Sequence, residues 1–194
     1  MRKVKLQMQM SIDGFVAGPD GEMDWMSWNW GDDINKYVAD LTTPVDTILL
    51  GRNMAGGFIS HWKEITKNPD DPQYPFARIM YDTPKVIFSK KLSKSDPVLK
   101  EWDNSILVNG IISEEIKQLK AQPGKDIIVY GGANFVSNLI RYNLIDEYHL
   151  FINPAVIGSG KTIFKEREER LNLKLIEATA FSCGIVVLCY HPAQ

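Results

Sequence analysis

Cysteine and histidine are both scarce in this sequence, and their positions exclude two kinds of stabilising site. The 194 residues include two cysteines and three histidines. Cys183 and Cys189 stand six residues apart within one expected strand, about 20 Å of extended chain, so a disulfide between them is excluded. No Cys-x-x-Cys pair occurs, and His61, His149 and His191 are far apart in the sequence. We therefore expect no structural zinc or other metal site.

The chain also lacks a long apolar run and an excess of either charge. No stretch of about 18 apolar residues occurs, and residues 3–10 alternate polar with apolar, unlike a signal peptide. We therefore expect a cytoplasmic protein. Lys and Arg number 22 against 24 Asp and Glu, a formal net charge of −2, which removes the simplest argument for nucleic acid or an anionic membrane as a partner. The length and the 44% hydrophobic content indicate one globular domain over residues 1–194.

Hydrophobic spacing predicts alternating strands and helices followed by a strand-rich end. Apolar residues recur at every second position from Val4 to Met10, as in a strand with one face inward. Short continuous apolar runs predict strands buried on both faces at 47–50, 85–89, 105–108 and 126–130. Helices are expected at 32–41, at 113–120 with Ser113 as N-cap, and at 134–142. Strands follow at 148–152, 171–179 and 185–190, and the proline-rich segment 67–75 predicts a loop.

This order of elements predicts an α/β fold. We expect a mixed, mostly parallel sheet flanked by helices, with antiparallel strands at its C-terminal end.

The strongest local signal for binding is the glycine pair Gly131 and Gly132, which lies between a buried strand and a helix. Glycines let a backbone approach an anion closely, and the free N–H groups of a helix start can bind phosphate. The segment is neither GxGxxG nor a Walker loop, and its alternative interpretation is a plain tight turn.

Two further segments follow strands in the same way. Gly51 and Arg52 end the 47–50 strand, and an arginine fork suits a phosphate because it can donate two parallel hydrogen bonds. Ser89 and Lys90 follow the next strand. Each basic residue alone is as well explained as a solvated surface charge, but together with the glycine pair they make a dinucleotide with an extra phosphate plausible.

A loop rich in tryptophan offers an aromatic surface. Trp25, Trp28 and Trp30 lie within six residues, and they could form a wall for a planar substrate or a contact between two copies of the chain. The nearby carboxylates are Asp13, Asp24, Asp32 and Asp33. Asp13 is alternatively a turn residue, and Asp32 is alternatively a helix cap.

Together these segments resemble the dihydrofolate reductase-like superfamily. The segments that carry the resemblance occur in the family's order: Ser11-Ile-Asp-Gly14, Leu50-Gly-Arg52, Val86-Ile-Phe-Ser89, Val129-Tyr-Gly-Gly132, Leu144-Ile-Asp-Glu147, Pro154-Ala-Val-Ile-Gly-Ser-Gly160 and Phe164. More closely, the chain resembles the RibD C-terminal domain, the reductase domain of riboflavin biosynthesis, and its stand-alone bacterial relatives. The resemblance extends from Lys3 to about Tyr190.

The resemblance implies an NADPH-binding sheet, a homodimer, and hydride transfer to a pterin or a ribosylated aminopyrimidine. By matching position it implies an adenosine 2′-phosphate at Arg52, with Ser89 and Lys90 nearby. It implies a pyrophosphate along Gly131, Gly132 and Ala133, and a nicotinamide flanked by Ser11, Val16 and Ala17.

The same resemblance implies substrate residues. Asp33 and Tyr37, at i and i+4 on one helical face, match the region of the substrate carboxylate and the ring-stacking aromatic. Asp33, or else Asp13 or Asp24, would orient the substrate and assist protonation.

Two departures from the family pattern bear on the substrate. Thr83 and Pro84 stand where the arginine that grips the folate glutamate would fall, and Met54 stands where a hydroxyl would contact phosphate. We therefore expect an NADPH-dependent reductase nearest to 5-amino-6-(5-phosphoribosylamino)uracil reductase. The alternatives are a reductase with another substrate, a dihydrofolate reductase, a non-catalytic NADPH-binding module and a structural homodimer.

Overall fold

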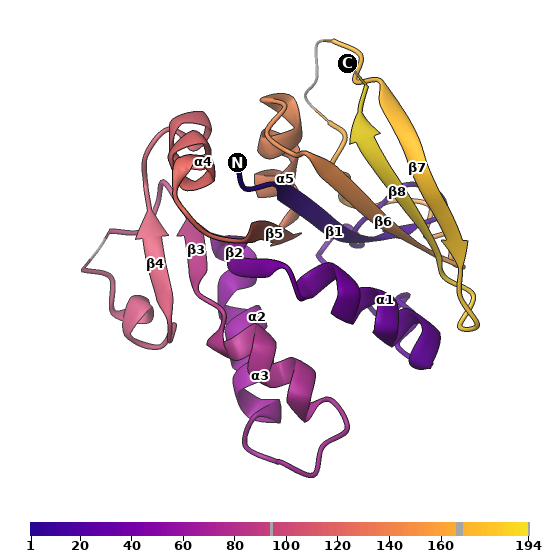
Figure 1. Cartoon of the computed structure of the whole chain (residues 1–194), viewed down its shortest axis with the longest axis horizontal. Coiled ribbons are helices and arrows are strands. Elements are labelled where there is room, and N and C mark those ends of the chain that lie inside the picture. The colour runs from indigo at the N-terminus through magenta and orange to yellow at the C-terminus, as the bar shows by residue number, and fades with distance from the viewer. Residues whose placement is uncertain (94, 166–168, 194) are drawn as a thin grey trace.

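The computed structural model describes residues 1–93, 95–165 and 169–193, and its strands form one eight-stranded sheet (Figure 1). The strands are β1 (Val4–Ser11), β2 (Val45–Gly51), β3 (Lys85–Phe88), β4 (Ser105–Val108), β5 (Asp126–Gly131), β6 (Glu147–Asn153), β7 (Leu173–Ala180) and β8 (Val186–Pro192). Their order in the sheet is β4-β3-β2-β5-β1-β6-β8-β7. The pairs from β4 to β6 are parallel, and β8 is antiparallel to both β6 and β7. The predicted fold class is confirmed.

Helices cover both faces of the sheet. They are α1 (Asp32–Thr42), α2 (Arg52–Ile65), α3 (Tyr74–Asp82), α4 (Ile112–Ala121) and α5 (Ala133–Arg141), with a short 3-10 helix at Pro97–Lys100. Figure 1 shows α1, α2 and α3 on one side of the sheet and α4 and α5 on the other.

Alternation along β1 divides its side chains between these two faces. Val4, Leu6, Met8 and Met10 are buried in the core that includes Val136 of α5. Because successive strand residues point to opposite faces, the polar side chains of β1 at positions 5, 7 and 9 point toward the face that carries α1. This face is therefore the more polar one.

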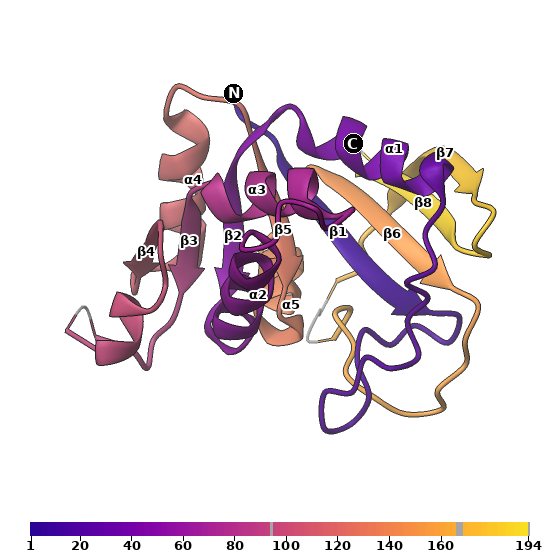
Figure 2. The same cartoon turned by 90° about the horizontal axis from the view of Figure 1, so that it is seen from below.

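The parallel strands all end at one edge of the sheet, which we call the C-terminal edge. Figure 2 shows the loop after β1 and the loop after β6 side by side at this edge. Backbone hydrogen bonds join the two loops, from Ile12 N–H to the Ala155 carbonyl at 2.8 Å and from Val16 N–H to the Lys161 carbonyl at 2.8 Å.

The structure corrects three sequence-based expectations. Helix α4 begins at Ile112, and its N-cap is Ile111 without a side-chain hydrogen bond, so Ser113 lies in the first turn and is not the cap. Cys183 lies in the turn before β8, so the two cysteines do not share a strand, and both are free.

Helices α2 and α3 are the third difference, because no helix was expected there. Gly56 and Gly57 weaken the helical signal of α2. Helix α3 begins at Tyr74 and holds Pro75 in its first turn, where proline is tolerated. The predicted loop therefore ends two residues early.

Candidate functional site

Two helix N-termini meet at the C-terminal edge, on the neighbouring strands β2 and β5. Gly51 is the N-cap of α2 and Gly132 is the N-cap of α5, and neither helix has a side-chain cap or an acidic residue in its first turn. The N–H groups at a helix start carry partial positive charge and can bind an anion. The structure thus brings two such groups together without an internal carboxylate to neutralise them.

Steric contacts around Gly51 and Gly131 leave little room for a side chain at either position. A Cβ on Gly51 would lie 2.8 Å from the Phe135 Cβ and 3.2 Å from the Gly132 nitrogen. A Cβ on Gly131 would lie 2.6 Å from the Met54 Sδ, and Gly131 has a φ of 138°. The two helix starts therefore approach each other more closely than residues with side chains would allow.

Basic and hydroxyl side chains follow the next strand at the same level. Gly51 pairs with Phe88 in register, so Arg52 and Ser89 both emerge at this edge. The Ser89 Oγ accepts the N–H groups of Lys91 at 3.0 Å and Leu92 at 3.1 Å. The Asn109 amide donates to the Ser89 carbonyl at 2.7 Å, and this ordering residue was missed by the sequence analysis. Lys90 is exposed beside them.

The three residues expected at the nicotinamide lie at the end of β1. The Ser11 Oγ accepts the Phe15 N–H at 3.0 Å and closes the turn that follows the strand. Val16 is buried, and Ala17 is half-buried and forms a bridge with Lys161. Since β3, β2, β5 and β1 are adjacent, the residues expected at the cofactor lie along four neighbouring strands, about 14 Å across.

The two carboxylates expected to be catalytic contact backbone N–H groups. Asp13 accepts the Gly158 N–H at 2.7 Å and so holds the loops after β1 and β6 together. Asp33 accepts the Ser182 N–H at 2.8 Å and its hydroxyl at 3.2 Å, which joins α1 to the turn before β8.

These contacts bias both carboxyl groups toward the ionised form. Hydrogen bonds from Ser11 and from the Gly158 backbone lower the pKa of Asp13. Hydrogen bonds from the Ser182 and Ile34 backbones lower the pKa of Asp33. Both groups are thus better suited to accept a proton or a hydrogen bond than to donate one. The third carboxylate, Asp24, is exposed.

The tryptophan loop is fixed to the end of β6. Asn153 is fully buried, and its Oδ1 accepts the Ser27 N–H at 2.9 Å. Trp30 stacks on Phe151 with ring centroids 6.2 Å apart. Trp28 contacts Trp30 and is 63% exposed.

Trp25, the expected substrate residue, lies in the same loop. It is half-buried, and its indole N–H donates to the Glu22 carbonyl at 3.2 Å.

A row of polar side chains crosses the sheet face beneath α1 and α2. We call Tyr130 of β5, Gln7 of β1 and His149 of β6 the polar row; Gln7 and His149 are register partners. Among the residues that the structure describes, the Tyr130 hydroxyl and the Gln7 Oε1 are buried without a hydrogen-bond partner, and the His149 Nε2 lies 3.5 Å from the Glu147 Oε2. Tyr37 of α1 contacts the row through a 2.7 Å hydrogen bond between its hydroxyl and the His149 Nδ1.

Buried polar atoms without partners are uncommon in folded proteins, so the polar row is a feature that the fold alone does not require. Sequence reasoning missed it, although polar residues at alternate positions of an otherwise apolar strand, Lys5, Gln7 and Gln9, were a readable signal.

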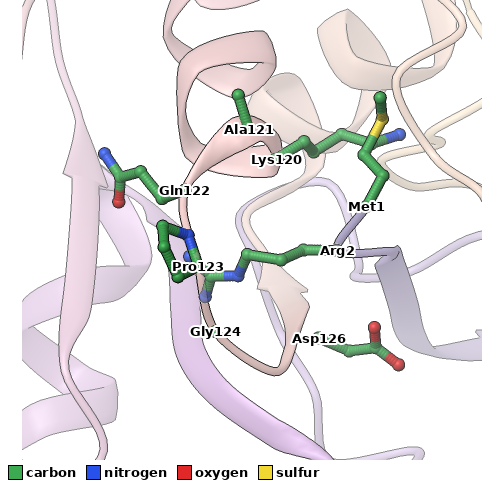
Figure 3. Close-up of a pocket in the computed structure, with 8 residues that line it drawn as sticks. All are labelled: Met1, Arg2, Lys120, Ala121, Gln122, Pro123, Gly124 and Asp126. Atoms are coloured by element: carbon green, nitrogen blue, oxygen red, sulfur yellow. The ribbon is translucent and has the colours of Figure 1, made fainter.

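A separate hollow of about 460 Å³ lies at the opposite edge of the sheet, near the start of β5 (Figure 3). Its arginine, Arg2, is buried, donates to the Lys125 carbonyl at 2.6 Å and pairs with Asp46. These contacts tie β1 to the turn before β5, so we interpret the hollow as part of the scaffold.

Two other kinds of site are absent from the part of the chain that the structure describes. No group of three or more His, Cys, Asp or Glu residues within 1–93, 95–165 and 169–193 is arranged to hold a metal ion. In the same ranges, no helix has the length and apolar character needed to cross a membrane.

Comparisons with known proteins show which family this protein belongs to. The model of the RibD C-terminal domain family matches residues 2–187. The uncharacterized protein YyaP of Bacillus subtilis is 35% identical over 191 residues, which cover 98% of this chain and 95% of YyaP. The riboflavin biosynthesis protein RibD of Corynebacterium ammoniagenes is 24% identical over 82% of this chain and 45% of that protein.

Solved structures share the fold at lower identity. A deaminase/5-amino-6-(5-phosphoribosylamino)uracil reductase of Thermotoga maritima has a TM-score of 0.66 at 16% identity, over 99% of this chain and 57% of that one. A dihydrofolate reductase of Enterococcus faecalis, solved in complex with NADP(H), has a TM-score of 0.60 at 13% identity, over 99% and 97% of the two chains.

Proposed function

The chain belongs to the RibD C-terminal domain family, and we propose that it is an NADPH-dependent reductase. It transfers a hydride to a pyrimidine- or pterin-type heterocycle, and its nearest known activity is that of 5-amino-6-(5-phosphoribosylamino)uracil reductase. The observation that supports this proposal best is the meeting of two glycine-capped helix starts, at Gly51 and Gly132, on neighbouring strands.

The residues present fit a dinucleotide that carries an additional phosphate. The N–H groups that follow Gly51, and those of Gly132 and Ala133, would hold the pyrophosphate, because they belong to two helix starts without an acidic residue in the first turn. Arg52, with Ser89 and Lys90, would hold the 2′-phosphate. When bound, the cofactor supplies the hydride, while the protein supplies position and charge.

The nicotinamide and the substrate are proposed to meet at the end of β1. Ser11, Val16 and Ala17 would flank the nicotinamide ring, and Tyr37 and Trp25 would contact the substrate from α1 and the tryptophan loop. Asp33 and Asp13 remain predicted catalytic carboxylates, in the role of orienting the substrate through accepted hydrogen bonds.

The protein is further proposed to act as a homodimer in the cytoplasm. The edge strand β7 exposes Leu175 and Ile176, each 49% accessible, and an exposed apolar edge strand is a ready surface for pairing. Light scattering of the purified protein at several concentrations tests this proposal, and a monomer at all concentrations would contradict it.

Nucleotide preference tests the cofactor site directly. Fluorescence titration should show tighter binding of NADPH than of NADH, because Arg52 and Lys90 are placed to meet the extra phosphate. Arg52→Ala should abolish most of the preference while leaving NADH affinity nearly unchanged. Arg78→Ala, which removes an exposed arginine paired with Asp82 of α3, serves as the matched control. Equal affinities in the wild-type protein would remove the assignment of the phosphate site.

Turnover separates the enzyme from a binding module. NADPH oxidation should be followed with 5-amino-6-(5-phosphoribosylamino)uracil and, separately, with dihydrofolate as acceptor. Consumption with the pyrimidine supports the proposed reductase, whereas tight NADPH binding without consumption supports a non-catalytic module.

A further inference from the structure

A buried carboxylate lies two residues before His149 on the same face of β6. Glu147 is 9% exposed, and its Oε2 lies 3.5 Å from the His149 Nε2. The ammonium groups of Lys3, at 2.6 Å, and Lys5, at 3.9 Å, contact the same carboxylate. The His149 imidazole and these ammonium groups hold the pKa of Glu147 at about 2, against the effect of burial. Glu147 is therefore ionised at neutral pH.

The other ring nitrogen of His149 contacts a phenol. The Tyr37 hydroxyl lies 2.7 Å from the His149 Nδ1, and burial raises the pKa of Tyr37, so the phenol keeps its proton. Packing fixes the ring, since Tyr37 contacts Phe151 and Phe181 edge-to-face at 5.9 Å and 5.5 Å. Carboxylate, imidazole and hydroxyl thus form one chain of polar contacts from β6 to α1.

This series of polar contacts, Glu147–His149–Tyr37, lies close to the proposed cofactor position. His149 pairs with Gln7 of β1, and Leu6 pairs with Val129 of β5, so Gln7 lies level with Tyr130, one position before Gly131. Across the sheet, two strand intervals of about 4.8 Å each separate His149 on β6 from Gly131 on β5. The polar contacts of His149 therefore lie on the same level of the sheet as the turn at Gly131 and Gly132.

Gln7 provides an independent indication of a ligand beside His149. It is 8% exposed, and its Oε1 has no hydrogen-bond partner in the described ranges. A buried amide oxygen of this kind is costly unless a donor reaches it. A polar heterocycle over β1 would supply that donor.

We propose that Tyr37 donates the proton that accompanies hydride transfer, and that His149 and Glu147 position and polarise its hydroxyl. This inference rests on the proposed reductase function. In the protonated imidazole, the Nδ1–H donates to the Tyr37 oxygen and the Nε2–H faces the Glu147 carboxylate, which leaves the phenolic hydrogen free for the substrate.

Atoms and charge balance in this hydride and proton transfer. Hydride from NADPH forms a C–H bond at the electrophilic carbon of a C=N or C=O group, and the π electron pair moves to the nitrogen or oxygen. The Tyr37 O–H bond breaks as its proton joins that atom, and the phenolate recovers a proton from the His149 Nδ1. NADPH is oxidised, the substrate is reduced, and the neutral imidazole is reprotonated from solvent.

The exposed carboxylates suit this role less well. Asp13 and Asp33 accept backbone N–H groups at 2.7 Å and 2.8 Å, and these bonds favour their ionised forms. An ionised carboxylate has no proton to give, so either residue can orient a substrate but is a poor acid.

Titratable and charged groups face His149 and Glu147 from every element packed against them. They are Lys3, which precedes β1, Lys5 of β1, Asp126 of β5, Glu177 of β7, Cys189 and His191 of β8, and Tyr37 of α1. Glu147 is the carboxylate at ion-pair distance from the ring.

Single-turnover hydride transfer from NADPH to 5-amino-6-(5-phosphoribosylamino)uracil tests the proposal. Tyr37→Phe should slow hydride transfer by about 100- to 10,000-fold, the usual effect of losing a general acid, with NADPH affinity unchanged. His149→Gln should slow the step and flatten its pH profile, because glutamine hydrogen-bonds the phenol but does not titrate.

His191→Gln is the matched control, since His191 also lies beside Glu147, at 3.7 Å, on the neighbouring strand β8. It should keep both the rate and the pH profile. A Tyr37→Phe variant with normal hydride transfer, or a His149→Gln variant with the wild-type profile, would overturn the proposal.

A substrate-free measurement keeps this test separate from the proposed function. The ring ¹⁵N chemical shifts of His149 should differ from wild type in Glu147→Gln and in Tyr37→Phe, because each variant removes a contact to one ring nitrogen, but not in His191→Gln. Unchanged His149 ring shifts overturn the inference whether or not any acceptor is reduced. Failure of NADPH to bind would instead contradict the proposed function.

Discussion

Replacing Glu147 by glutamine should destabilise the protein in a strongly pH-dependent way. The structure holds the pKa of this carboxyl at about 2, against an ordinary value of 4.5. At about 1.4 kcal/mol per pKa unit, the difference corresponds to about 3 kcal/mol of folding stability. Because the folded-state pKa is depressed, this stability is present above about pH 4.5 and is lost as the pH falls toward about 2.

Loss of the carboxylate also affects its neighbours. Lys5 is 8% exposed and would lose one of its two carboxylate partners among the described residues, keeping the ion pair with Asp126 at 3.0 Å. Removing one partner from a buried charged cluster commonly costs about 3 to 5 kcal/mol. Both arguments predict a Glu147→Gln variant about 3 kcal/mol less stable than wild type near neutral pH.

Urea unfolding at several pH values measures this difference. It should be largest near neutral pH and should fall to about half near pH 3 as the wild-type carboxyl takes up protons. Glu64→Gln, which removes a carboxylate from an exposed pair with Lys67, should cost less than about 1 kcal/mol at every pH. A Glu147→Gln cost that is constant with pH, or no larger than that of the control, would refute the reasoning.

Three further predictions concern the rest of the site. Gly51→Val should abolish NADPH binding and lower the melting temperature, because the valine Cβ would lie 2.8 Å from the Phe135 Cβ. Fluorescence titration and thermal melting check this prediction, and normal nucleotide affinity would contradict it. Asp33→Asn should lower the melting temperature through weaker contacts with Ser182. It should slow hydride transfer by about tenfold, since Asp33 is proposed to orient the substrate and not to donate the proton, whereas a loss of about 100-fold or more would make Asp33 the acid. Dihydrofolate should be a poor acceptor, because Thr83 carries no positive charge to pair with the glutamate tail, and its hydroxyl donates to the Ile79 carbonyl. Turnover of dihydrofolate at about 10 per second would refute this prediction.

The short-range hydrophobic pattern of the sequence was sufficient to predict much of the fold. Alternation from Val4 to Met10 predicted β1 and its apolar face, and continuous apolar runs predicted the buried strands at 47–50 and 126–130. The order of short motifs indicated the family that the comparison shows. These features depend on residues near each other in the chain, so a single sequence reveals them.

Only the tertiary structure decided which side chains meet beneath α1. Gln7 and His149 are 142 positions apart, and strand register makes them partners. Tyr37 reaches His149 from a helix 112 positions away, and Asp33 reaches Ser182 across 149 positions. The period of a strand determines which of its residues share a face, but it does not determine which strand or helix packs against that face. The partners of Tyr37 and Asp33 therefore follow from how the sheet and its covering helices assemble.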